Sequence, residues 1–271
     1  MAGRLAGQGA IVTGAADGLG RATSIALARE GAGVLLVDID EQRLGETQAL
    51  IADAGGTAVP FVADVRRSEE VQAYVAAAQA EFGSIDAFFN NAGVSGHYGP
   101  LVDYPEDEFD NVIAVNLRGV FLGLKYVLRV MFEQGSGAIV NTASMASIGA
   151  IPGVVAYVAS KNAVMGLTKN AAMEAATKGV RVNAVLPGNI QTKMALPGGD
   201  EALEEDIRRL ASPVPQGRVG LPSEIADAVV FLVSDESRHI TGVGLPVDGG
   251  ITALVYPASF MPLDAQLDTT G

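Results

Sequence analysis

Short apolar runs alternate with longer amphipathic stretches along most of this chain. The runs are apolar at successive positions, which is typical of strands that are buried on both faces of a parallel sheet. The stretches between them have helical periodicity and enough length to serve as right-handed crossovers. The sequence therefore predicts an α/β fold with a doubly wound, mostly parallel sheet and helices on both of its faces.

The elements expected from this pattern begin near the N-terminus and continue to residue 186. The expected strands are 10–13, 34–37, 58–62, 85–89, 138–142 and 180–186. The expected helices are 19–30, 41–54, 68–82, 106–132 and 155–176. No linker or low-complexity tract interrupts the chain, so residues 1–250 are expected to form one domain.

The segment 189–220 breaks this rhythm, because Pro197, Pro213 and Pro215 surround a charged helical piece. The segment follows the carboxyl end of a strand, where ligands bind in open α/β sheets. We expect it to be a substrate lid. The alternative is a surface excursion that has no role in binding.

The composition excludes several classes of protein. The formal net charge is −13, and an acidic surface repels phosphate backbones and anionic lipids, so neither nucleic acid nor a membrane is an expected partner. The chain has no cysteine and no HExxH pattern, so no metal site is expected. No apolar run approaches the roughly 20 residues that cross a bilayer, and the N-terminus lacks a signal peptide. We expect a cytoplasmic protein.

A glycine-rich turn follows the first expected strand. Gly14, Gly18 and Gly20 are spaced GxxxGxG, with Asp17 and Leu19 between them. Glycine is needed where a Cβ would keep the backbone away from a pyrophosphate, and the free N–H groups at a helix start face its charge. In a βαβ unit, this turn indicates a dinucleotide site.

Asp38, followed by Ile39, ends the second expected strand. A carboxylate about 20 residues beyond the glycines can accept hydrogen bonds from both hydroxyls of the adenosine ribose, and it repels the extra phosphate of NADP. Asp17 adds a second negative charge in the turn. Together they favour NAD over NADP, and the alternative is that Asp38 is an ordinary strand-end residue.

Residues 64–65 and 90–93 follow the carboxyl ends of the third and fourth expected strands. Because the carboxyl ends of parallel strands meet at one edge of the sheet, these residues are expected beside the dinucleotide crevice. Such residues are also common in ordinary loops. The cofactor contacts expected here are Asp64, Val65, Asn90, Ala92 and Gly93.

Four side chains suit proton transfer. Tyr157 and Lys161 are four residues apart on an expected helix and therefore share one face. A phenol has a pKa near 10, and a neighbouring ammonium with the positive nicotinamide ring is expected to lower that pKa. Ser144 can donate to a substrate oxygen. Asn116, a poor helix former in an expected helix, can hold water in a proton relay. Packing and turn formation are the plain alternatives for all four.

These features occur in a fixed order, and together they resemble the short-chain dehydrogenase/reductase family of the shorter, single-domain type. The resemblance covers residues 5–250 and implies a seven-stranded Rossmann fold. It is carried by TGAADGLG, Asp38, Asp64-Val65, NNAG, Asn116, Ser144, YVASK and Pro187-Gly188.

The resemblance also implies roles for single residues. Tyr157 is implied as the general acid/base, with Lys161 as the modulator of its pKa and as a ribose contact. Ser144 is implied to polarise the substrate oxygen, and Asn116 to support the proton relay. Members of the family are usually tetramers built around the long helices 106–132 and 155–176, so we expect a homotetramer. The further cofactor contacts that it implies are Pro187, Gly188, Ile190 and Thr192.

Three regions are less standard. His97-Tyr98, soon after NNAG, is expected either to border the substrate or to belong only to a glycine-rich loop. Met145, Ile151, Val154 and Met194 flank the expected active site and suggest an apolar substrate pocket, although core packing explains them equally well. The tail 251–271 runs about twenty residues past the usual end and is too apolar for a free tail. We expect the tail to pack at a subunit interface.

The sequence thus predicts an NAD-dependent oxidoreductase that interconverts a secondary alcohol and its ketone, acting on a small apolar or cyclic molecule. A 3-oxoacyl-thioester reductase is the rival within this chemistry, and Asp17 and Asp38 count against it because that role normally uses NADPH. A catalytically silent NAD-binding regulatory or scaffold protein is the rival from another class. Such a protein would have little reason to keep all four catalytic residues.

Overall fold

The computed structural model describes residues 3–196 and 202–254. Seven strands form one parallel sheet in the order β3-β2-β1-β4-β5-β6-β7, so the expected doubly wound fold is confirmed. The strands are β1 (Gly9–Thr13), β2 (Gly33–Asp38), β3 (Thr57–Val62), β4 (Ala87–Asn90), β5 (Gly137–Thr142), β6 (Val180–Pro187) and β7 (Gly244–Val247). The α-helices are α1 (Gly18–Arg29), α2 (Glu41–Asp53), α3 (Ser68–Phe82), α4 (Glu106–Ile113), α5 (Val120–Gln134), α6 (Val155–Ala175), α7 (Glu204–Ala211) and α8 (Pro222–Val233).

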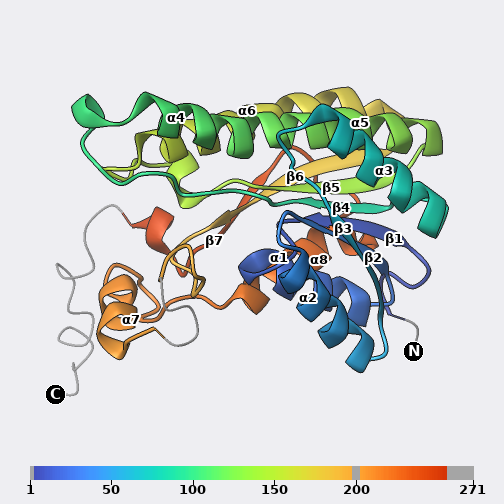
Figure 1. Cartoon of the computed structure of the whole chain (residues 1–271), viewed down its shortest axis with the longest axis horizontal. Coiled ribbons are helices and arrows are strands. Elements are labelled where there is room, and N and C mark those ends of the chain that lie inside the picture. Colours follow the sequence, from blue (N-terminus) through green and yellow to red (C-terminus); the bar gives the residue numbers. More distant parts are fainter. Residues whose placement is uncertain (1–2, 197–201, 255–271) are drawn as a thin grey trace, which may run out of the picture.

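The strand order reverses at β1, with β2 and β3 on one side and β4 to β7 on the other. Helices α3, α4, α5 and α6 cover one face of the sheet, and α1, α2 and α8 cover the opposite face (Figure 1). The chain therefore leaves β1 and β4 toward opposite faces. This switch point, at the carboxyl ends of the strands, is where open α/β sheets bind their ligands.

Neighbouring residues of the central strands belong to two different hydrophobic cores. Ile11 of β1 and Phe88 of β4 pack on one face, whereas Val12 and Phe89 pack on the other. All four are at most 1% exposed. Side chains alternate between the faces of a strand, and both faces are covered, so every position must be apolar. This explains the continuous apolar runs of the sequence.

One continuous helical stretch, Glu106–Gln134, is long and apolar enough to cross a membrane by length and composition alone. Half of its most apolar 18-residue window is buried within the protein. The stretch packs against α3, α6 and the central strands. Its place in the core therefore accounts for the buried half of this window.

Some boundaries differ from those expected. The strand expected at 85–89 is found at Ala87–Asn90, preceded by Asp86, whose backbone bonds Gly9 and Ala138 and whose carboxylate accepts the N–H of Gly9 at 2.9 Å. The single helix expected at 106–132 contains a π-helical segment, Ala114–Gly119. The sequence pattern gave no residue range for β7 or α8. Pro222 and Glu224 form an N-terminal capping signal that could have located the start of α8.

Candidate active site

A cavity of about 600 Å³ opens at the carboxyl ends of the strands. Residues from the loops after β1, β4, β5 and β6 line it, together with the first turns of α1 and α6 and with α7. Of the expected site residues, it is lined by Gly14, Asp17, Gly18, Leu19, Asp38, Ala92, Gly93, Ser144, Met145, Ile151, Val154, Tyr157, Lys161, Pro187, Gly188, Ile190, Thr192 and Met194.

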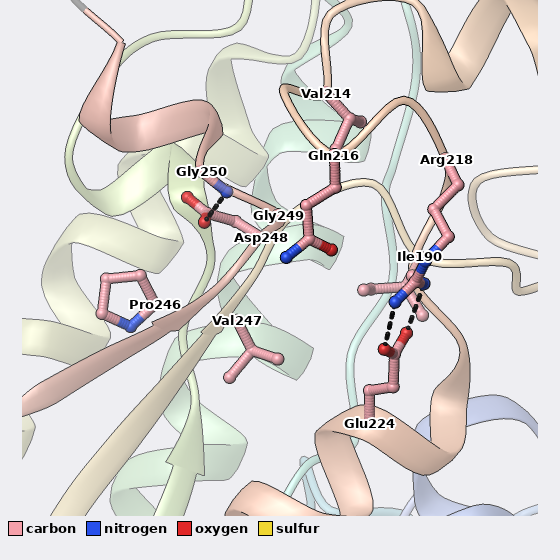
Figure 2. A pocket seen from close by; sticks show the side chains of 11 residues that line it. Ile190, Val214, Gln216, Arg218, Glu224, Pro246, Val247, Asp248, Gly249 and Gly250 are labelled. Carbon is pink, nitrogen blue, oxygen red and sulfur yellow. Dashed lines mark hydrogen bonds and ion pairs between the residues drawn. The ribbon is translucent and has the colours of Figure 1, made fainter.

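A second cavity of about 310 Å³ lies beyond Ile190, which lines both. Figure 2 shows its charged side chains already engaged: Arg218 pairs with Glu224 through contacts of 2.6 and 2.9 Å, and Asp248 accepts the N–H of Gly250 at 2.9 Å. The Arg218 guanidinium holds the pKa of Glu224 down at about 2, so this carboxylate stays charged and paired. The first pair joins α8 to the segment before it, and the second contact orders the turn after β7. None of the expected catalytic residues lines this second cavity, so the larger cavity is the candidate active site.

The glycine-rich turn forms a close cradle at one end of the larger cavity. Gly14 and Gly18 have φ values of +68° and +50°, which side chains rarely adopt. A Cβ on Gly20 would lie 1.9 Å from the carbonyl oxygen of Gly14, and a Cβ on Gly14 would lie 2.9 Å from Nδ2 of Asn91. Asp17 caps α1 by accepting the N–H of Gly18 at 2.8 Å. A turn that excludes side chains and leads into a helix N-terminus fits a dinucleotide pyrophosphate.

The carboxylate of Asp38 lies at the rim of this cradle. It accepts the N–H of Ala16 at 3.1 Å, that of Ile39 at 2.7 Å and that of Asp40 at 3.2 Å. These three contacts fix the carboxylate between the end of β2 and the glycine-rich turn, where it lines the cavity. The described residues place no ion pair on it, so its negative charge faces the cavity.

Asp17 is not the free negative charge that the sequence suggested. Its Oδ2 lies 3.2 Å from Nη1 of Arg43 and 3.3 Å from Nζ of Lys193. Burial alone would raise its pKa, but the hydrogen bonds from Gly18 and Lys193 and the nearby positive charges outweigh burial and lower it. Asp17 is therefore ionised and compensated, and the electrostatic argument against NADP depends on Asp38.

Lys161 is enclosed beside the chemical end of the cavity. Its Nζ donates to the carbonyl oxygen of Thr142 at 2.7 Å and lies 5.5 Å from the ring centroid of Tyr157. Only 3% of the residue is exposed, and burial lowers the pKa of its ammonium to about 8. The loop after β5 is tied to α6 as well, because Ser147 Oγ donates to the carbonyl oxygen of Lys161 at 2.8 Å.

Tyr157 and Ser144 are brought together in the same cavity. Burial raises the pKa of Tyr157, and its hydrogen bond with Ser144 offsets part of that increase. Lys161 was expected to lower the pKa of Tyr157. In the protein without cofactor this pKa is raised instead, because burial removes water from the phenolate and this effect is the largest. Ser144 is 5% exposed and its Oγ accepts the N–H of Ala146 at 3.1 Å, which fixes its direction.

Asn116 is fully buried in the π-helical segment and does not line the cavity. Its Oδ1 accepts the N–H of Val94 at 2.8 Å, and its Nδ2 donates to the carbonyl oxygen of Val94 at 2.9 Å and to Ser160 at 3.2 Å. It thus binds the loop after β4 to α6. A Cβ on Gly93 would lie 3.2 Å from Oδ1 of Asn116 and 3.6 Å from Nζ of Lys161, so all three groups are neighbours.

Several other expected residues lie outside the cavity lining. Asn90 is buried and donates to the carbonyl oxygen of Val120 at 3.0 Å and to Asn141 at 3.1 Å, a bracing role between strands. Asp64 pairs with Arg66 at 2.7 Å. The remaining members of this group are Gly20, Ile39, Val65 and His97.

His97 packs edge-on against Tyr104, with ring centroids 5.6 Å apart. Its neighbour Tyr98 lines the cavity instead and lies against Gly153, where an added Cβ would meet the Tyr98 ring at 2.8 Å. Of the pair His97-Tyr98, the tyrosine therefore lines the cavity and the histidine does not. The lining residues that were not named singly from the sequence are Asn91, Ser95, Thr142, Ala143, Asn189, Lys193, Ala195 and Leu210.

The expected lid is described except for residues 197–201. Thr192, Lys193, Met194 and Ala195 from its first part and Leu210 from α7 all line the cavity. Its ends are joined by a bridge between Ile190 and Gly220. Of the tail expected at a subunit interface, residues 255–271 lie outside the described residues.

Comparisons with known proteins agree with this geometry. A family model described as enoyl-(acyl carrier protein) reductase matches residues 14–252. A levodione reductase of Leifsonia aquatica is 43% identical over 90% of this chain and 93% of its own length, and a 3-oxoacyl-[acyl-carrier-protein] reductase of Thermotoga maritima is 40% identical over 92% and 99%.

Solved structures give the same result. The crystal structure of a levodione reductase superposes with a TM-score of 0.89 at 40% identity, covering 93% of this chain and all of the other. That of an NAD⁺-bound xylitol dehydrogenase gives a TM-score of 0.83 at 36% identity, covering 91% and 99%. The chain belongs to the short-chain dehydrogenase/reductase family.

Proposed function

We propose that the chain is an NAD-dependent oxidoreductase that interconverts a secondary alcohol and its ketone, with Tyr157 as the general acid/base. The observation that carries the proposal is the convergence of Ser144, Tyr157 and Lys161 in one cavity that also contains the glycine-rich cradle. Proteins of this family use a nicotinamide cofactor, and relatives such as a 2-(S)-hydroxypropyl-CoM dehydrogenase of Xanthobacter autotrophicus, 39% identical over 94% of this chain, act on alcohols.

When bound, the nicotinamide ring supplies the hydride acceptor or donor. In ketone reduction, the phenol of Tyr157 gives its proton to the carbonyl oxygen. Its raised pKa keeps that proton in place at neutral pH. Ser144 donates to the same oxygen and stabilises the charge that develops there. In alcohol oxidation Tyr157 takes the hydroxyl proton, which requires the phenolate and therefore becomes faster as pH rises.

Lys161 and Asn116 support this proton transfer without contacting the substrate oxygen. A charged Lys161 favours the phenolate of Tyr157, and its depressed pKa places its own titration near working pH. Asn116 holds the backbone of Val94 and the helix that carries Tyr157 in register. We propose that water held near Asn116 and Lys161 completes the proton route.

The preference for NAD rests on Asp38. Its carboxylate is fixed at the cradle by three backbone N–H groups and lines the cavity without an ion-pair partner among the described residues. A carboxylate at this place accepts hydrogen bonds from ribose hydroxyls and repels a 2′-phosphate.

The apolar side chains at the substrate end of the cavity favour a small, neutral and apolar molecule, and we propose a cyclic one. Met145, Ile151 and Val154 line the cavity together with Met194 and Leu210 of the expected lid. The two cations among the described lining residues are Lys161, which donates to Thr142 at the chemical end, and Lys193, which lies beside Asp17 at the glycine-rich cradle. Within the described lining, an anionic substrate would therefore find no free counter-charge at the chemical end.

The similarity to a 3-oxoacyl-[acyl-carrier-protein] reductase keeps acyl thioester reduction as the second candidate. A silent NAD-binding protein is the third, and the retained Ser144, Tyr157 and Lys161 argue against it. We also propose a cytoplasmic homotetramer, which the exposed apolar side chains Phe121 of α5 and Met173 of α6 support, being 45% and 64% exposed.

Absorbance at 340 nm tests the proposal. Purified protein with NAD or NADP is offered a panel of secondary alcohols at alkaline pH, and a 3-oxoacyl thioester with NADH or NADPH. We expect turnover of cyclic alcohols with NAD at least about tenfold above NADP. Thioester turnover with NADPH alone would support the reductase instead, and absence of all turnover despite NADH binding would support the silent protein.

A further inference from the structure

Lys193 is the one cation at the cofactor end of the larger cavity, within the described lining residues. The other cation of that lining, Lys161, is buried at the chemical end and donates to Thr142. The lining also includes the carboxylates of Asp17 and Asp38, and the whole chain has a net charge of −13. A dinucleotide with two negative phosphates therefore enters an unfavourable field unless a local positive charge offsets it.

The position of Lys193 is set by Asp17. The carboxylate is fixed because it caps α1 at 2.8 Å, and Arg43 contacts the same Oδ2 from α2 at 3.2 Å. Nζ of Lys193 lies 3.3 Å from this oxygen, although 53% of its side chain is exposed. The ammonium is thus held beside the helix start instead of extending into water.

The backbone around Lys193 approaches the same turn. A Cβ on Gly18 would lie 3.4 Å from Cγ2 of Thr192, so the segment after β6 lies directly on the glycine-rich turn. An ammonium has three N–H donors, and one contact with Asp17 leaves donors for a second anion. Lys193 therefore lies beside the cradle, lines the cavity and retains donors for a second anion.

We infer that Lys193 is a binding residue for the cofactor pyrophosphate and that Asp17 is the positioning residue that holds it there. This rests on the proposed function, from which it takes the anionic dinucleotide. In this arrangement Asp17 does not repel the cofactor, because its charge is shared between Arg43 and Lys193. The positioning of Lys193 would explain why an acidic residue, Asp17, stands in a phosphate-binding turn.

Binding of cofactor fragments by titration calorimetry tests the inference without any substrate. The probes are ADP-ribose, which contains the pyrophosphate, and adenosine, which does not. Lys193→Gln is expected to weaken ADP-ribose binding by about fivefold, the upper value for a partly exposed ion pair, and to leave adenosine binding within about twofold. The difference for ADP-ribose should shrink at about 0.5 M salt because charges are screened. Lys178→Gln, the same charge change at an exposed site before β6, is the matched control and should bind like the wild type.

Asp17→Asn separates positioning from simple repulsion, since asparagine still caps the helix. We expect weaker ADP-ribose binding, and a smaller further loss on adding Lys193→Gln than in the wild type. Stronger binding in Asp17→Asn with additive effects would overturn the role of Asp17. Unchanged ADP-ribose binding in Lys193→Gln, or an equal loss for adenosine, would overturn the role of Lys193. If the wild type bound neither ADP-ribose nor NADH, the proposed function itself would fall.

Discussion

The ammonium of Lys161 is enclosed by protein, and the carbonyl oxygen of Thr142 is its acceptor among the described residues. Burial depresses its pKa from 10.5 to about 8. Below the folded pKa, the folded protein must hold a charge that the unfolded chain exposes to water, and this costs stability. The contribution of Lys161 to stability therefore becomes more favourable as pH rises from about 8 to about 10.5.

Lys161→Met is expected to separate stability from activity. Removing the buried charge while keeping the apolar stem should raise Tm by a few degrees at pH 7. The same change should lower kcat by about 100-fold or more, because Tyr157 loses its neighbouring positive charge. Thermal unfolding and turnover are measured beside Lys169→Met, an exposed lysine of the same helix, which should alter neither. A clear decrease of Tm in Lys161→Met would contradict this account of its environment.

The catalytic residues could be grouped from the sequence, whereas the ion pairs of Asp17 could not. The grouping of Ser144, Tyr157 and Lys161 followed from spacing on one helix and from the order of the strands. The pairing of Asp17 with Arg43 and Lys193 did not, because these partners lie 26 and 176 residues away in sequence. The sequence alone does not show which charges are paired. Asp17 was therefore expected to repel the extra phosphate of NADP, although its charge is compensated by Arg43 and Lys193.

Among the elements, the helical stretch from α4 to α5 departs most from expectation. A regular helix was expected, and the π-helical segment Ala114–Gly119 interrupts it. A π-helical turn has one extra residue per hydrogen-bonded ring and is frequent at functional sites. Here it contains Asn116, whose amide bonds both backbone groups of Val94. The poor helix propensity of Asn116 indicated an unusual position in this helix, but it did not predict the π-helical backbone.

Asn116→Ala is expected to lower the free energy of unfolding by about 1–3 kcal/mol, because the buried polar groups of Val94 and Ser160 lose their partner. Urea unfolding gives this value from the midpoint and the slope. Asn170→Ala, which removes an exposed asparagine bonded to Glu174, is the control and should change stability little. Equal stability of both variants would show that the Asn116 contacts are not significant in the folded protein.

The βα alternation was predictable because each central strand is buried on both faces, which forces every position to be apolar. The edge strands were harder to place. β3 was found, whereas β7, only partly buried and containing Pro246, was not expected as a range. An edge strand has fewer burial constraints and tolerates proline, so its sequence pattern is weak.

At the scale of the whole molecule, one sheet and its switch point account for the place of the active site. Topology brings the ends of β1, β4, β5 and β6 to one edge, and this is why residues from 14 to 210 line one cavity. The homotetramer and the packing of residues 255–271 at an interface stay predictions, since both depend on other copies of the chain. A molar mass from light scattering is the direct check of assembly.

If Tyr157 is the acid/base of hydride transfer in this cavity, Tyr157→Phe should abolish most of the activity and leave cofactor binding in place. The variant keeps the ring and removes only the hydroxyl. NADH binding, followed by fluorescence, should remain within about threefold of the wild type, whereas turnover of the best alcohol at 340 nm should fall by about 1,000-fold or more. Turnover within tenfold of the wild type, with NADH still bound, would contradict the account.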